Sequence, residues 1–377
     1  MKKKIFYLVK NLDMGGTELH LVSIIPSLAK YFDIEVLTLA HKGLLASQLE
    51  LKGIKVWTAL SDKDLSFVEK FPHFIRVILT HLLRLKNLYL KFKKSPPDIL
   101  HFYLPEAYIM GTLASLLSGF KGTRILSRRS LNAYQQRRPL AGWMERKLHR
   151  FTDKAVGNSL TVMKNLETEG FLKEKLYLIY NGLPIRQETV SSFSKDENKT
   201  VIVKVANLIP YKGHEDLLHA LSQIKGDWKL ILVGADSHGY ESHLKKTANT
   251  LGIGDKISWL GRRDDVRKIL ESADIFVLSS HEEGFSNAIL EAMSCSLPVI
   301  ASDVGGNSEA VLHNETGIIF QARNREALAE ALKTLLENKD LARHMGLKGR
   351  KRLESLFTHK RCIEGYMHLY GEMESAK

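Results

Sequence analysis

Short apolar runs alternate along the chain with longer segments of helical periodicity. In the first half, the runs cover residues 4–9, 34–40, 98–103, 123–129, 154–159 and 175–182. A second series covers residues 200–208, 228–235, 256–261, 274–280, 297–303 and 316–320. Alternation of this kind is typical of right-handed βαβ units on a parallel sheet. The pattern therefore predicts an α/β protein with two open parallel sheets.

A polar stretch between the two series marks the predicted domain boundary. At 377 residues, the chain is about twice the commonest domain size. We expect a Rossmann-like domain at residues 1–186, a linker at 187–199 and a second Rossmann-like domain at 200–360. Residues 361–377 are expected to form a helix that packs back on the first domain. Because ligands bind beyond the carboxyl ends of the strands in such sheets, we expect the two domains to face each other across a ligand-binding cleft.

Composition is typical of a globular protein in a reducing compartment. Hydrophobic residues make up 44% and charged residues 26% of the chain, with no tract that favours disorder. The apolar run near the N-terminus is too short for a signal peptide. The weakly polar stretch 108–120 is shorter than the roughly 20 residues that span a bilayer. Cys295 and Cys362 lack metal or redox spacing, so we expect a cytoplasmic protein.

Positive charge is concentrated in the first half of the chain. Residues 1–190 hold 30 Lys and Arg against 16 Asp and Glu, whereas residues 191–377 hold 25 against 26. Such a field attracts nucleic acid, anionic lipid or a phosphorylated acceptor, and charge alone does not choose between them. Nucleic acid is disfavoured, because the sequence shows no aromatic stacking motif, zinc site or recognition helix.

Residues 65–94 combine an apolar stripe with basic residues. The apolar positions are Phe71, Phe74, Ile78, Leu82, Leu85 and Phe92, and the basic ones are Arg76, Arg84, Lys86, Lys91, Lys93 and Lys94. A helix of this kind can lie on an anionic membrane, at the inner face of the cytoplasmic membrane and near a lipid-linked acceptor. It can equally be a core helix with a solvated basic side. Both interpretations stay open at this point.

The segment EGFSNAILE, residues 283–291, follows a predicted strand and carries the most specific chemistry. Ser286 is expected to cap a helix that begins at Asn287, which places Glu283 at the positively polarised end of this helix. Glu291, about a turn farther in, could accept hydrogen bonds from ribose hydroxyls, while amides after Phe285 face phosphate oxygens. The alternative is that both carboxylates flank an ordinary helix and are solvated.

These motifs resemble the large retaining glycosyltransferase family four, which has the two-domain GT-B fold. The resemblance rests on EGFSNAILEAM, PVIASDVGGNSEAV, ANLIPYKGHEDLLHAL, LVGADSHG, WLGRRDDV, YNGLP and LDMGGTELHLV, in the expected order. It implies transfer of a sugar from a nucleoside-diphosphate sugar with retention of anomeric configuration, without a cofactor or an obligatory metal. It also implies that Asp264 and Asp265 lie near the nucleobase.

Under this resemblance, Lys212 stabilises the negative charge of the departing diphosphate; alone it would be an exposed turn residue. The family usually has an arginine five residues earlier, where this chain has Asn207, which supplies no charge. Arg262 or Arg263 is a candidate replacement. The predicted donor-binding set is Gly15, Gly16, Asn207, Lys212, Arg262, Glu283, Gly284, Phe285, Ser286, Asn287 and Glu291, with Lys212, Glu283 and His101 as catalytic residues.

Residues at the ends of the N-terminal strands form the predicted acceptor side. These are His101, Tyr103, Arg128 and Arg129. The arginine pair suits a phosphate-bearing acceptor or could supply the charge missing at Asn207. Glycine pairs at Gly15–Gly16 and Gly305–Gly306 offer backbone amides to a ligand, or simply form tight turns.

The sequence thus predicts a retaining glycosyltransferase that moves a hexose-type sugar to a glycolipid, polysaccharide precursor or similar acceptor in cell-envelope glycan synthesis. An alternative enzyme is a sugar-nucleotide epimerase or hydrolase of the same architecture, with Glu283 and His101 as acid or base. A basic nucleic-acid-binding protein is the alternative outside enzymology. The sequence specifies neither base, sugar, acceptor nor oligomeric state.

Overall fold

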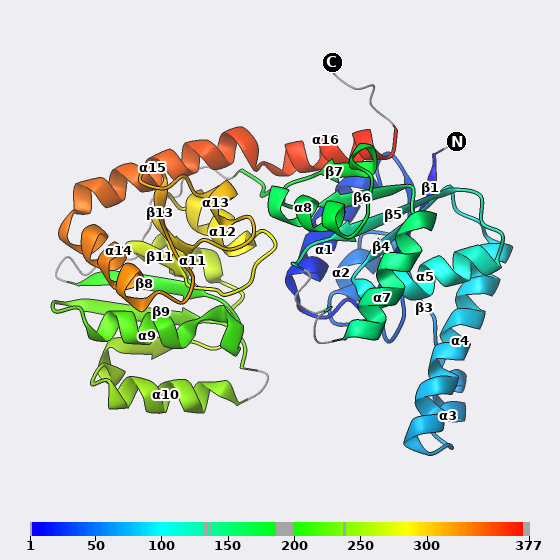
Figure 1. The fold of residues 1–377 in the computed structure, drawn as a ribbon, viewed down its shortest axis with the longest axis horizontal. Helices are drawn as coiled ribbons and strands as arrows, with labels where there is room; N and C mark the ends of the chain where they lie inside the picture. The colour runs from blue at the N-terminus through cyan, green and yellow to red at the C-terminus, as the bar shows by residue number, and fades with distance from the viewer. Residues whose placement is uncertain (1, 132–134, 136–137, 186–198, 237–238, 372–377) are drawn as a thin grey trace. The chain divides into compact units, whose positions relative to one another are not determined.

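The computed structural model describes residues 2–131, 135, 138–185, 199–236 and 239–371. The chain divides into an N-terminal unit, Met1–Ile179 with Cys362–Lys377, and a C-terminal unit, Tyr180–Arg361. Figure 1 shows the helices and strands of each unit. The predicted linker, 187–199, lies outside the described residues except for Lys199.

The N-terminal unit is built on a seven-stranded sheet of order β3-β2-β1-β4-β5-β6-β7, and every pairing is parallel. The strands are β1 (Lys4–Val9), β2 (Asp33–Thr38), β3 (Lys55–Thr58), β4 (Ile99–Tyr103), β5 (Thr123–Arg128), β6 (Lys154–Gly157) and β7 (Leu176–Leu178). Strand β3 was not predicted, because its four residues KVWT give too short a run.

Helices cover both faces of this sheet. They are α1 (Gly16–Leu28), α2 (Ala46–Glu50), α3 (Asp62–Val68), α4 (His73–Lys94), α5 (Pro105–Leu117), α7 (Pro139–Leu148), α8 (Leu160–Thr168) and α16 (His359–Leu369). Alternate residues of β1 point to opposite faces: Ile5 packs in the core with α1, α2 and α16, and Phe6 in the core with α4, α5 and α8. The sheet is therefore the middle of three layers.

The C-terminal unit has a six-stranded parallel sheet of order β10-β9-β8-β11-β12-β13. Its strands are β8 (Thr200–Val205), β9 (Trp228–Val233), β10 (Ile257–Trp259), β11 (Ile275–Leu278), β12 (Val299–Ser302) and β13 (Gly317–Phe320). Its helices are α9 (His214–Ser222), α10 (Tyr240–Thr250), α11 (Val266–Glu271), α12 (Asn287–Ser294), α13 (Asn307–Ala310), α14 (Arg325–Glu337) and α15 (Lys339–Leu356). The strands form near-continuous apolar runs, as expected for a sheet covered on both faces.

The division between the units differs slightly from the prediction. Tyr180 and Asn181, assigned from sequence to the first domain, pack in the C-terminal unit: the Tyr180 ring lies 5.1 Å from Phe285, and the Asn181 amide donates to the Phe285 carbonyl at 3.1 Å. Tyr366 and Leu369, in the segment predicted to pack back on the first domain, are buried in the core of the N-terminal unit. The first unit therefore ends at Ile179, a few residues before the predicted domain end at residue 186.

Helix α4 is only half packed. Its C-terminal half buries Leu88 and Phe92 against the sheet, whereas Phe74 is 75% and Leu82 56% exposed. In Figure 1, α3 and the N-terminal half of α4 extend beyond the sheet of their unit. Residues 65–94 thus form the end of α3 and the whole of α4. The packed half of α4 fits the core-helix interpretation, and membrane binding by the exposed half stays a prediction.

Candidate functional site

The residues with the most specific predicted chemistry lie where the strand order of the C-terminal sheet reverses. From β8 the chain proceeds outward through β9 and β10, and it then returns to β11 on the other side of β8. The crevice at such a reversal, beyond the carboxyl ends of the strands, is the usual ligand site of open α/β sheets. Lys212 follows β8 and Glu283 follows β11, so adjacent strands carry both residues to this edge.

Lys212 and Glu283 are in direct contact. The Lys212 ammonium donates to Glu283 Oε1 at 2.7 Å, and the Ser280 hydroxyl donates to the same oxygen at 2.7 Å. Burial acts to lower the pKa of Lys212, but Glu283 holds it above its ordinary value. The ammonium is therefore charged at neutral pH, and the carboxylate balances this charge.

Two glycines allow the loops around this pair to pack closely. Gly213 has φ +63°, and a Cβ atom there would lie 1.8 Å from the Ser279 carbonyl oxygen. Gly305 has φ +56°, and its Cβ would lie 1.9 Å from the Glu283 carbonyl oxygen. Both positions need glycine for conformation and for space. The Gly306 amide donates to the Gly284 carbonyl at 2.8 Å, so the Gly305–Gly306 turn supports the Glu283 loop.

Helix α12 begins at Asn287, as predicted, but its cap differs. Ser286 occupies the N-cap position without making a side-chain capping bond. Asn181 holds this turn instead, with its amide 2.6 Å from Asn287 Oδ1 and 3.1 Å from the Phe285 carbonyl. Phe285 itself is a core side chain. The Ser286 side chain therefore leaves the first amides of the helix for another acceptor.

Glu291 lies on α12, one turn into the helix. In the described part of the chain, its carboxylate has no hydrogen-bond or ion-pair partner, and burial raises its pKa to about 7. Glu291 is half-buried, and carboxylates removed from water are usually paired. An unpaired one beside a helix start is a good acceptor for two hydroxyl groups of a ligand.

Three polar residues near the ends of β8 and β10 were candidates for the second half of a diphosphate clamp. The exposed Asn207 accepts a bond from the Ala235 amide at 3.3 Å. Arg263 is committed to Asp265 through two bonds of 2.8 Å. Arg262 is exposed, in a loop whose Gly261 carbonyl accepts from the Gly234 amide at 2.9 Å. Arg262 is therefore the better candidate for the missing cation of the clamp, because Arg263 is paired with Asp265.

Gly15 and Gly16 lie at the corresponding reversal of the N-terminal sheet, between β1 and β4. Gly15 is the N-cap of α1, and Gly16 is exposed, so that a Cβ atom added at Gly16 would have nothing within 4 Å. Glu18 of the same turn is buried, and burial raises its pKa. Gly16 therefore presents its backbone to open space, whereas a Cβ at Gly15 would meet the Glu18 carboxylate at 2.3 Å. The ligand of this turn remains a prediction.

His101 and Tyr103 do not line an open surface, which corrects their predicted role. His101 is 0% exposed, and its ring nitrogens lie 2.7 Å from the Tyr370 hydroxyl and 2.8 Å from the Ser127 hydroxyl. Tyr103 is also fully buried, 3.2 Å from the Tyr366 hydroxyl. Burial and the nearby charge of Arg129 lower the pKa of His101 to about 3, so it stays neutral. Helix α16 covers both side chains, so neither reaches an open surface of the described structure.

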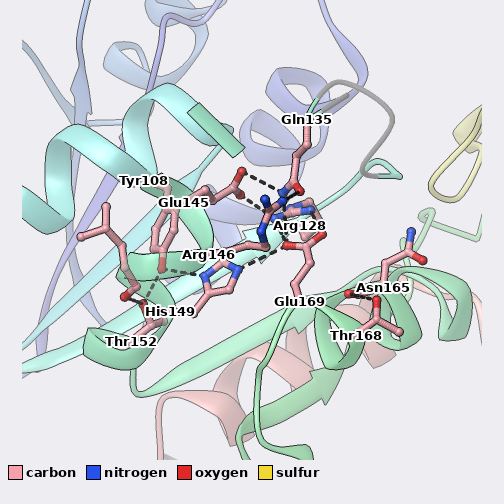
Figure 2. Close-up of polar contacts among 11 residues, drawn as sticks. Tyr108, Arg128, Gln135, Glu145, Arg146, His149, Thr152, Asn165, Thr168 and Glu169 are labelled. Atoms are coloured by element: carbon pink, nitrogen blue, oxygen red, sulfur yellow. Dashed lines mark hydrogen bonds and ion pairs between the residues drawn. The ribbon is translucent and has the colours of Figure 1, made fainter. Parts of the chain in front are cut away.

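Arg128 is likewise internal, and Figure 2 shows its polar contacts with Glu145 and Glu169. It is 3% exposed and pairs with Glu145 and Glu169. Burial acts to raise the pKa of Glu169, but His149 and Arg128 hold it at about 2. Arg128 therefore neutralises buried carboxylates and is not available to an acceptor. Arg129, the next residue, is half-buried, and its role stays a prediction.

Sequence reasoning missed several residues around the site. Asn181 and Ser280 hold loops, and Lys204 is a fully buried lysine of β8. The only signal for Lys204 is one charge inside the apolar run TVIVKV. Among the described side chains, no group of three or more His, Cys, Asp or Glu is arranged to hold a metal ion.

Solved glycosyltransferases share the architecture of the whole chain. The structure of HepE from Anabaena in complex with UDP covers 98% of this chain and 100% of its own, with a TM-score of 0.84 and 22% identity. This likeness and the order of the strands in the two sheets show that the chain has the GT-B fold. Profiles described as "Glycosyltransferase Family 4" and "Glycosyl transferases group 1" match residues 14–187 and 185–352. The chain belongs to glycosyltransferase family 4.

Curated relatives match this chain at low sequence identity. The N-acetyl-alpha-D-glucosaminyl L-malate synthase of Bacillus anthracis is 28% identical over 55% of this chain and 54% of its own length. The lipopolysaccharide core biosynthesis glycosyltransferase LpsE of Rhizobium meliloti is 23% identical over 79% of this chain and 82% of its own. The chain thus spans about half the length of the Bacillus relative.

Proposed function

We propose that this protein transfers a hexose-type sugar from a nucleoside-diphosphate sugar to a glycan or lipid-linked acceptor, with retention of configuration, in cell-envelope glycan synthesis. The observation that carries the proposal is the Lys212–Glu283 pair, 2.7 Å apart, at the strand reversal. The unpaired, half-buried Glu291 on the adjoining helix supports it. The structural neighbour HepE has been solved with UDP-glucose, and the relative LpsE is named for lipopolysaccharide core biosynthesis.

Each residue has a role in this proposal. Glu291 accepts hydrogen bonds from the ribose hydroxyls, and amides at the start of α12 contact the diphosphate. Lys212 stabilises charge as the bond between sugar and diphosphate breaks. Glu283 releases Lys212 to the diphosphate and orients the sugar. The acceptor hydroxyl attacks from the leaving-group face and gives its proton to the departing phosphate oxygen, so no protein nucleophile is needed.

This scheme assigns the stabilisation of diphosphate charge to protein groups. We therefore expect transfer to continue in the presence of EDTA. Activity that disappears with EDTA and returns with a divalent cation would replace this part of the proposal with a metal-assisted one.

We also propose that the N-terminal unit attaches through α4 to the inner face of an anionic cytoplasmic membrane. Helix α4 contains six basic and no acidic residues. Its exposed half presents apolar side chains, with Phe74, Ile75, Val77, Ile78 and Leu82 among them. Basic helices with an exposed apolar face bind anionic lipid surfaces. None of the described helices is long and apolar enough to cross a bilayer.

The direct test is calorimetry of the folded protein with UDP, GDP, ADP and their glucose, galactose, mannose or N-acetylglucosamine derivatives. We expect one base to bind. The bound donor is then incubated with a cell-envelope lipid extract, and the products are identified by mass spectrometry. An acceptor that gains one sugar is the expected result. Absence of binding to every nucleotide would overturn the proposal, and an epimerised or hydrolysed donor without glycosylated acceptor would favour the alternative enzyme.

A further inference from the structure

Lys204 is a buried lysine that connects the two loops of the proposed donor site. It lies in β8 on the same face as the core residue Ile202 and is 0% exposed. Its amine donates to the Lys212 carbonyl at 2.6 Å and to the Ser279 hydroxyl at 2.6 Å. The Ser279 hydroxyl in turn donates to the Gly213 carbonyl at 2.6 Å. Lys204 therefore lies directly behind the turn that carries Lys212.

The two loops that Lys204 connects carry little net positive charge of their own. Lys212 is paired with Glu283, and Asn207 carries no charge. A nucleoside diphosphate brings two to three negative charges to this edge, and charge-assisted contacts are the strongest means of holding them. A second cation close to Lys212 would satisfy this need.

We propose that Lys204 is a positioning residue for the donor diphosphate: it takes up a proton from solvent when the diphosphate binds beside Lys212, and its ammonium then stabilises the anion from behind this turn. This inference rests on the proposed function and deepens it.

The surrounding charges fit such a change of protonation. Burial and the charge of Lys212 lower the pKa of Lys204 to about 7, while Glu283 and Asp216 oppose the shift. On α9, burial and Lys204 lower the pKa of His214, which is therefore neutral. Asp216 is engaged by Arg325 at 2.8 Å and His281 at 2.7 Å.

A neutral amine already has two N–H groups for its two bonded oxygens. Both bonds to the Lys212 carbonyl and the Ser279 hydroxyl thus persist in either state. An added proton changes the charge of Lys204 without requiring the loops to rearrange. An approaching anion favours the charged form and raises the pKa of the amine.

The experiment uses UDP and the full chain, with calorimetry at pH 8 in two buffers of different ionisation enthalpy. Near pH 8 the diphosphate of UDP is almost fully ionised and its uracil is still neutral, so the difference in binding enthalpy between the two buffers reports protons taken up by the protein. We expect uptake of roughly one proton per UDP, and a loss of UDP affinity that approaches tenfold per pH unit just above pH 8. If the native protein binds UDP without proton uptake, the inference is overturned, whatever the variants do.

The variant Lys204→Met tests whether Lys204 is the residue that takes up the proton when UDP binds. We expect this variant to bind UDP roughly tenfold or more weakly and without proton uptake, whereas Lys229→Met, at an exposed position of β9, behaves as the native protein. The double variant Lys204→Met/Asn207→Arg restores a permanent charge at an exposed position and should regain affinity without proton uptake. Native-like uptake in Lys204→Met would overturn the inference alone. A native protein that binds no nucleoside diphosphate would overturn the proposed function as well.

Discussion

The ammonium of Lys212 lies 2.7 Å from Oε1 of Glu283, so the two side chains form an ion pair in the absence of a ligand. A diphosphate must compete with Glu283 for Lys212. We therefore expect Lys212→Met to weaken UDP binding by roughly 10- to 100-fold and Glu283→Gln to strengthen it several-fold. Transfer of sugar should fall at least about 100-fold in both variants, because each removes a group that acts on the breaking bond. Calorimetry and product formation measure the two effects separately, and weaker UDP binding by Glu283→Gln would contradict the competition.

We expect the Glu291 carboxylate to favour ligand binding but to lower the stability of the fold when it is ionised. Its folded pKa of about 7 exceeds the ordinary value, so the folded state resists ionisation, and stability is lost as the pH rises from about 4.5 to 7. Glu291→Gln should gain up to about 3 kcal/mol of stability at pH 8 and nothing at pH 4. It should also lose UDP affinity. Denaturant unfolding at both pH values tests this, and an equal gain at pH 4 and pH 8 would exclude ionisation as the cause.

Gly305 can be tested against a glycine that has the same backbone requirement but open space. Gly252 has φ +70° and nothing within 4 Å of an added Cβ, whereas Gly305 has the Glu283 carbonyl in the way. We expect Gly252→Ala to cost about 1 kcal/mol of unfolding free energy and to leave UDP binding unchanged. Gly305→Ala should cost more and should weaken UDP binding, because it displaces the Glu283 loop. Identical behaviour of the two variants would show that the close packing is unimportant.

The buried Arg128 predicts a stability effect in the N-terminal unit. Arg128→Met leaves Glu145 and Glu169 without their guanidinium, and breaking a buried pair costs about 3 to 5 kcal/mol. Because the pKa of Glu169 is lowered to about 2, its stabilisation is complete above pH 4.5 and is lost as the pH falls from 4.5 to 2. The stability difference between native and variant should shrink over this range. Lys164→Met, on the exposed face of α8, is the control, and UDP binding should persist in both.

Membrane attachment through α4 can be measured by sedimentation with phosphatidylcholine vesicles that contain or lack phosphatidylglycerol. We expect retention only with the anionic lipid. Phe74→Ser/Ile78→Ser and Lys93→Gln/Lys94→Gln should each reduce it, whereas Leu117→Ser, an exposed apolar position on α5, should not. Lys91 is omitted, because it pairs with Glu35 at 2.5 Å. Equal retention of all variants would exclude α4 as the attachment surface.

Residue patterns predicted the C-terminal site better than the N-terminal one. The run TVIVKVANL and the motif EGFSNAILE place Lys212 and Glu283 after neighbouring strands, and local chain geometry then brings them together. Tyr103 and Arg128 also end their strands, but the environment of Tyr103 depends on α16, which is distant in sequence, and that of Arg128 depends on α7. Sequence spacing cannot indicate which strand ends a later helix will cover. Ser286 has the correct residue type for a cap, but Asn181, 105 positions earlier, determines that turn.

The residues that complete the core of the N-terminal unit follow the C-terminal unit in the chain. Tyr366 and Tyr370 close the hydroxyl cluster around His101, and Leu369 packs beside them. On the ribosome, the C-terminal unit has all its strands and helices α9 to α15 before α16 emerges. Nascent N-terminal chains must therefore persist with an open apolar face while the second unit folds, and this interval is where chaperones would act.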